Sequence, residues 1–150
     1  MKKSKIFLAA AIIFANLTFS ATTALAEETN NFNSGNISSE TNIAVTDVSV
    51  AQAVDLINNK NALIIDVRTP EEFTESHLPE ANNFPVDTLS QNIETIKKLQ
   101  RDKPLLVYCR SGKRSARAAE KLKNLGVNSL YNLKGGIKAW SDANNPLVKE

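Results

Sequence analysis

Short apolar runs alternate with helical patterns along this chain, and this alternation constrains its fold more than any other feature. Residues 62–66 and 105–108 are mainly apolar runs, and residues 130–132 form a shorter one. Apolar runs of this length are typical of strands that are buried on both faces of a sheet. Strands that alternate with helices pair in parallel, and helices cover both faces. We therefore predict an α/β fold with a parallel sheet.

The predicted helices follow from apolar spacing and from capping signals. Ser49 is a predicted N-cap, and Thr69 caps the next helix, with Pro70 at its first position and Glu72 completing a capping box. Leu89, Ile93, Ile96 and Leu99 predict a third helix, a fourth is predicted over residues 115–125 and ends at Gly126, and the last covers residues 137–143 behind Gly135 and Gly136.

The first 26 residues have the pattern of a cleaved signal peptide. Lys2, Lys3 and Lys5 precede a mainly apolar stretch over residues 6–19, and an Ala-Leu-Ala cleavage site ends before Glu27. The apolar stretch is short for a membrane span. We therefore predict an exported protein, periplasmic or secreted, with no stable membrane anchor after cleavage of residues 1–26.

The remaining chain is predicted to be a flexible polar linker over residues 27–42 and a single domain over residues 43–150. The signal segment holds three of the 18 basic residues, so the rest, with 16 acidic residues, is close to neutral. Such a balance does not predict nucleic-acid binding. The basic residues near Cys109 suggest a small anionic ligand instead.

Cys109 is the predicted reactive group. It ends the run over residues 105–108 and opens a loop of small and basic residues: Arg110, Ser111, Gly112, Lys113, Arg114 and Ser115. Loop N–H groups, the start of the next helix and the cationic side chains all favour a thiolate, so the pKa of the thiol should fall below its free value of about 8.5. The alternative role for Cys109 is that of a small buried core residue.

The residue counts limit the other chemistry. One cysteine in an exported protein makes no internal disulfide, and without a C-x-x-C pair the chain has no dithiol for exchange. One cysteine and one histidine do not supply a closed metal shell, and we expect neither a metal nor a cofactor.

Asp66 and Arg68 are predicted to support the site, because they lie at the end of the strand that neighbours the cysteine strand. Asp66 is expected to organise the loop and not to act as an acid or base. For Arg68 two roles stay open: it lines the pocket, or it pairs with an acidic neighbour.

Four blocks in order give the chain a resemblance to single-domain rhodaneses, the thiosulfate sulfurtransferase-like family, here in an exported form. The blocks are residues 63–68 with 70–73, residues 77–85, residues 107–115 and residues 133–140. The resemblance covers about residues 44–141. It implies a five-stranded, mostly parallel sheet with helices on both faces, and a cysteine that carries sulfane sulfur as a persulfide. It also implies that His77 belongs to a structural turn. Trp140, with Gly135 and Gly136, is expected to pack the last helix and not to bind a ligand.

The resemblance predicts sulfur transfer from a donor such as thiosulfate to cyanide or a thiol, and another protein can supply that thiol. Cys109 would attack the outer sulfur of the donor, the amides of residues 110–115 would hold the terminal sulfur, and Arg110, Lys113 and Arg114 would attract the anion.

Three alternatives remain at this point. The first is a non-catalytic binding module with the same fold. The second is an exported thiol sensor or sulfur carrier, which would share the persulfide chemistry and differ only in its partner. Phosphatases and arsenate reductases are the third: their loops follow C-x5-R, whereas here Ser115 holds the sixth position and Arg114 comes one residue early. The shorter loop favours a single sulfur over a tetrahedral oxyanion.

Overall fold

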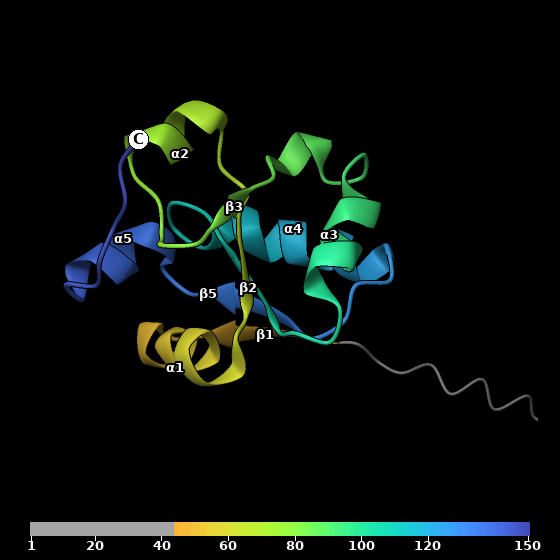
Figure 1. Cartoon of the computed structure of the whole chain (residues 1–150), viewed down its shortest axis with the longest axis horizontal. Coiled ribbons are helices and arrows are strands. Elements are labelled where there is room, and N and C mark those ends of the chain that lie inside the picture. The colour runs from red at the N-terminus through yellow and green to blue at the C-terminus, as the bar shows by residue number, and fades with distance from the viewer. Residues whose placement is uncertain (1–43) are drawn as a thin grey trace, which may run out of the picture. The chain divides into compact units, whose positions relative to one another are not determined.

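The computed structural model describes residues 44–150, which contain one five-stranded sheet (Figure 1). The strands are β1 (Val45–Val48), β2 (Leu63–Asp66), β3 (Asn82–Asn83), β4 (Leu105–Tyr108) and β5 (Leu130–Leu133), in the order β1-β5-β4-β2-β3. Every strand pair is parallel. The α/β prediction is confirmed, and β1 is an edge strand that the apolar pattern did not predict.

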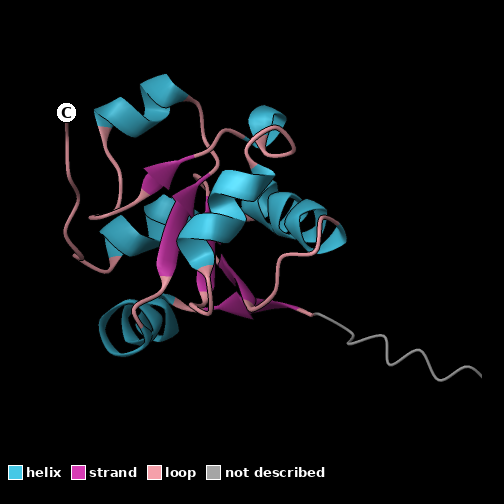
Figure 2. Cartoon of the chain, turned by 45° about the vertical axis from the view of Figure 1, so that its right-hand side comes forward, coloured by secondary structure: helices cyan, strands magenta, loops and turns pink. Residues whose placement is uncertain are grey.

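The helices cover both faces of the sheet, as Figure 2 shows. They are α1 (Val50–Lys60), α2 (Pro70–Glu75), the 3-10 turn η1 (Val86–Thr88), α3 (Ile93–Gln100), α4 (Lys113–Asn124) and α5 (Gly136–Asp142). One core cluster joins α3 and α4 to the sheet, and the other joins α1 and α5. β4 lies between them, and all four of its residues are buried. This position explains its uninterrupted apolar sequence.

The predicted caps of the first two helices are confirmed. Ser49 and Thr69 each accept a hydrogen bond from the backbone N–H three residues later, and each completes a capping box, with Gln52 and Glu72 respectively. Pro70 occupies the first turn of α2. Local sequence therefore determines where these helices begin.

The start of the third helix was predicted wrongly. α3 begins at Ile93, because Leu89 lies in the turn that follows η1. Apolar spacing places Leu99 on the core-facing side, but Leu99 is 42% exposed, whereas Gln100 is buried and donates to the carbonyl oxygens of Lys103 and Asn128. A buried polar side chain with two backbone partners takes a place that apolar spacing assigns to leucine.

The sheet places two strand ends side by side. Asp66 pairs in register with Tyr108, so the chain that leaves β2 and the chain that leaves β4 emerge together. Such carboxyl ends are where α/β sheets carry their sites.

None of the helices within residues 44–150 is long and apolar enough to span a membrane. The predicted signal peptide and linker lie outside the described residues.

Candidate active site

Cys109 follows β4 directly and is fully buried. Its Sγ accepts a hydrogen bond from the Gly112 N–H at 3.2 Å, and the Ser115 Oγ lies 3.4 Å away. Gly112 is the N-cap of α4 and has no side chain to bond the first N–H groups of that helix. The sulfur therefore lies where a helix start offers unused donors.

The loop depends on glycine. Gly112 has φ +88°, and a Cβ there would lie 3.0 Å from the Gly135 nitrogen and from the Leu133 oxygen. A Cβ on Gly136 would collide with the backbone of Cys109 and Arg110. The Ile137 N–H donates to the Cys109 oxygen at 2.9 Å, so the start of α5 holds the cysteine loop by direct backbone contact.

Hydrogen bonds determine the acidity of the thiol. Burial raises the pKa of Cys109, but the Ser115 hydroxyl and the N–H groups of Ser115, Ser111 and Gly112 outweigh burial and leave the pKa below its ordinary value. The direction agrees with the sequence prediction. The cause lies mainly in the loop amides and Ser115, not in the three cations.

The three loop cations differ in their surroundings. Arg110 and Lys113 are exposed, and within residues 44–150 neither makes an ion pair. Arg114 instead donates two hydrogen bonds of 2.9 Å to the Glu72 carboxylate on α2. This bond raises the pKa of Arg114 and lowers that of Glu72. Sequence patterns gave no signal for the pair, because its members lie 42 residues apart.

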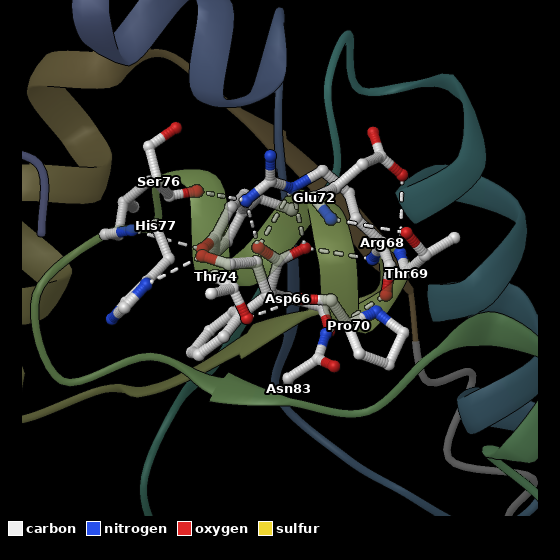
Figure 3. Close-up of polar contacts among 12 residues, drawn as sticks. Asp66, Arg68, Thr69, Pro70, Glu72, Thr74, Ser76, His77 and Asn83 are labelled. Carbon is white, nitrogen blue, oxygen red and sulfur yellow. Dashed lines mark hydrogen bonds and ion pairs between the residues drawn. The ribbon is translucent and has the colours of Figure 1, made fainter. Parts of the chain in front are cut away.

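Asp66 and Arg68 form a buried ion pair (Figure 3). The Asp66 carboxylate also accepts the Arg68 backbone N–H at 2.9 Å, while the Arg68 guanidinium donates to the Ser76 oxygen at 2.6 Å. The guanidinium lies 5.7 Å from the centroid of the Tyr108 ring. Burial lowers the pKa of Arg68, but the Asp66 partner outweighs burial and raises it. Both carboxylate oxygens have partners, as expected for a residue that organises the loop.

An open pocket of about 490 Å³ adjoins this pair. Arg68, Glu72, Arg110 and Lys138 are among its lining residues, and Cys109 is not. Arg68 thus pairs with an acidic neighbour, which is one of the two roles that the sequence left open, and it also lines this adjoining pocket. A reagent reaches the buried sulfur only when neighbouring atoms move.

A network of polar side chains connects the cysteine to strand β1. The sequence patterns did not predict this network. The Ser115 hydroxyl lies 2.6 Å from the Asn132 Oδ1, and the Asn132 Nδ2 donates to the Asp47 carboxylate at 2.8 Å. Ser115 and Asn132 are buried.

His77 and Trp140 have structural contacts. His77 is buried, stacks on Phe73 and forms an antiparallel bridge with Val148. Trp140 is buried and donates to the Pro146 oxygen.

Comparison with known proteins supports the resemblance. Residues 49–143 match the profile of the rhodanese-like domain. The chain is 43% identical over 81 residues to the uncharacterized protein YqhL of Bacillus subtilis, covering 54% of this chain and 62% of that protein. It is 35% identical to the thiosulfate sulfurtransferase GlpE of Vibrio cholerae, covering 67% of this chain and 91% of that protein. A crystal structure of a rhodanese-related protein from Thermoplasma volcanium matches with a TM-score of 0.60 and 34% identity, over 70% of this chain and 99% of that chain.

Proposed function

The chain belongs to the rhodanese-like domain family, and we propose that it moves sulfane sulfur from an anionic donor such as thiosulfate to cyanide or a thiol, through a persulfide on Cys109. The observation that carries this proposal is the Gly112 N–H bonded to the Cys109 sulfur at the uncapped start of α4. Relatives that are named sulfurtransferases support it.

In the first step, the Cys109 thiolate attacks the outer sulfur of thiosulfate. A Cys109 sulfur–sulfur bond forms, the sulfur–sulfur bond of thiosulfate breaks, and sulfite leaves with the electron pair. The lowered pKa of the thiol supplies the thiolate for this attack. Arg110 and Lys113, which are exposed and carry no ion pair within residues 44–150, attract the dianion.

In the second step, cyanide or a thiolate attacks the terminal sulfur of the persulfide. Thiocyanate or a new persulfide leaves, and the electron pair of the broken bond returns Cys109 to a thiolate. The terminal sulfur is negatively charged in the intermediate, and the N–H groups at the start of α4 are the donors that stabilise it.

The structure favours sulfur over phosphate as the transferred group. A cysteine-based phosphatase needs an arginine directed at the phosphate oxygens, whereas Arg114 bonds Glu72 with both of its terminal nitrogens. A carrier role, in which another protein's thiol takes the sulfur, uses the same two steps with a different acceptor.

Intact mass spectrometry tests the proposal. After incubation with thiosulfate, the protein should gain the mass of one sulfur atom, and a reducing agent should remove it. Cys109→Ser should neither gain sulfur nor convert thiosulfate and cyanide into thiocyanate. Added sulfur or turnover in folded Cys109→Ser would overturn the proposal, and so would the absence of any adduct on the wild-type chain.

We also propose that the protein acts outside the cytoplasm, on the basis of Lys2, Lys3, Lys5 and the apolar stretch that follows them. N-terminal sequencing of the extracytoplasmic fraction should find Glu27 first. A full-length, membrane-retained form would contradict the proposal.

A further inference from the structure

The hydroxyl of Ser115 has one proton and three neighbouring acceptors. These are the Asn132 Oδ1 at 2.6 Å, the Gly112 oxygen at 3.1 Å and the Cys109 Sγ at 3.4 Å. The shortest of the three contacts is to Asn132. When the hydroxyl donates there, only its lone pairs face the sulfur, and a lone pair accepts from a thiol but does not stabilise a thiolate.

Asp47 determines which end of the Asn132 amide faces Ser115. A carboxylate only accepts hydrogen bonds, so the Asn132 Nδ2 must face Asp47, at 2.8 Å, and the Oδ1 must face Ser115. The strand register fixes this contact, because Asp47 on β1 pairs directly with Asn132 on β5. A flipped amide would place its oxygen against the carboxylate.

We propose that Asp47 and Asn132 are positioning residues that compete with Cys109 for the single Ser115 proton and so make the conversion of Cys109 into the reactive thiolate less favourable than it would be without them. The inference rests on the proposed role of Cys109 as the sulfur-carrying group. In the wild-type chain, turning the Ser115 proton toward sulfur leaves the buried Asn132 oxygen without a donor. This loss opposes ionisation.

A substitution of Asp47, which is exposed, should remove this restraint on the ionisation of Cys109. Without the Asp47 carboxylate, the Asn132 amide is free to flip, its Nδ2 donates to the Ser115 oxygen, and its Oδ1 faces the exposed edge of the sheet. Ser115 then donates to the thiolate, and a bond to a charged acceptor is favoured over one to the neutral Gly112 oxygen. No buried polar atom is left without a partner in this arrangement.

Other charged groups lie on the elements that neighbour the cysteine loop, and they stay unchanged in the test. They are Arg110, Lys113 and Arg114 on the loop and its helix, Glu72 on α2, Asp66 at the end of β2, Arg68 after it, and Lys138 on α5.

The experiment measures the thiolate absorbance of the purified full chain as a function of pH, with Cys109→Ser as the blank. The chain has one cysteine, so the signal has one source. Asp47→Ala should lower the apparent pKa of Cys109 by about one unit, the scale of one hydrogen bond to a charge. Thr46→Ala, at an exposed neighbour on the same strand, should leave it unchanged.

Removing the Asp47 charge also favours a thiolate by simple electrostatics, and a double-mutant cycle separates the two causes. In a Ser115→Ala background, Asp47→Ala should lose most of its effect on the pKa, because only the electrostatic part remains. Asn132→Leu should lower the pKa although Asp47 keeps its charge. A shift that is undiminished without Ser115 and weakens in high salt would overturn the inference, as would an unchanged pKa in Asp47→Ala. Neither result depends on sulfur transfer, so this inference and the proposed function fail separately.

Discussion

Two strand-to-helix junctions lie side by side at the carboxyl ends of the neighbouring strands β2 and β4, and the helices that follow them are capped in different ways. After β2, Thr69 caps α2 with its side chain, and Glu72 completes the box. After β4, Gly112 caps α4 without a side chain, and its N–H donates to the Cys109 sulfur. We call the β2 junction closed, because its own side chains bond the helix start, and the β4 junction open, because no side chain caps its helix and a backbone N–H bonds the cysteine sulfur instead.

In the part of the chain that the structure describes, the charged side chains are paired at the closed junction and mostly unpaired at the open one. Asp66 and Arg68 satisfy each other in the interior, whereas Arg110 and Lys113 are exposed and make no ion pair within residues 44–150. Glu72 links the junctions, since it belongs to the capping box of α2 and also binds Arg114 of α4. Glu72 therefore joins the closed junction to the helix of the open one.

The largest effect on stability is expected at the closed junction. Arg68→Met leaves the buried Asp66 carboxylate without its ion-pair partner and should lower the free energy of unfolding by about 3–5 kcal/mol. Arg110→Met, which removes an exposed cation, should change it by less than about 0.5 kcal/mol. Denaturant unfolding measures both, and equal losses would show that the two junctions do not differ in this respect.

Gly112→Ala should disable the open junction. The added Cβ crowds Gly135 and Leu133 and displaces the N–H that bonds the sulfur, so thiocyanate formation should fall by about 10²–10³ in kcat.

Gly126→Ala is the matched control for this change. Its φ of +83° carries a similar backbone cost, but a Cβ there meets only the Lys97 side chain, at 3.5 Å or more. It should lower stability and leave kcat unchanged. Equal loss of kcat in both variants would attribute the effect to backbone strain alone.

Thr69→Ala opens the cap of α2 and should lower the free energy of unfolding by about 1 kcal/mol, with no change in the pKa of Cys109. Thr74→Ala, a change of the same type at an exposed position of the same helix, should not destabilise the protein. Thermal unfolding compares the two. A change in the ionisation of Cys109 would show that α2 contributes to the open junction directly.

The smallest effect is expected from the exposed cations. Replacing Arg110 and Lys113 together by Gln should raise the KM for thiosulfate by about threefold to tenfold and leave kcat nearly unchanged, because these side chains attract the anion in solution. Steady-state kinetics with Lys121→Gln as control checks this. An unchanged KM would mean that the two cations belong only to a solvated helix start.

Much of the fold and the centre of the site could be predicted from the chain. The apolar run of β4, the caps Ser49 and Thr69, and the glycine that opens α4 are local signals that the structure contains. Local sequence failed at α3, where Leu99 carries the expected apolar character but Gln100 has the inward direction. The Gln100 side chain points inward because it donates to the carbonyl oxygens of Lys103 and Asn128, and only the folded chain brings Asn128 within reach.

The sequence by itself determined most of the strands and helices and the place of the candidate cysteine between a strand and a helix, because period, capping and turn conformation are properties of neighbouring residues. Only the tertiary structure decided the polar partners of the site. Arg114 bonds Glu72, which lies 42 residues away in the sequence, and Asn132 bonds Asp47, which lies 85 residues away. Such contacts follow from strand order and register, which the packing of the whole sheet selects and no local pattern encodes.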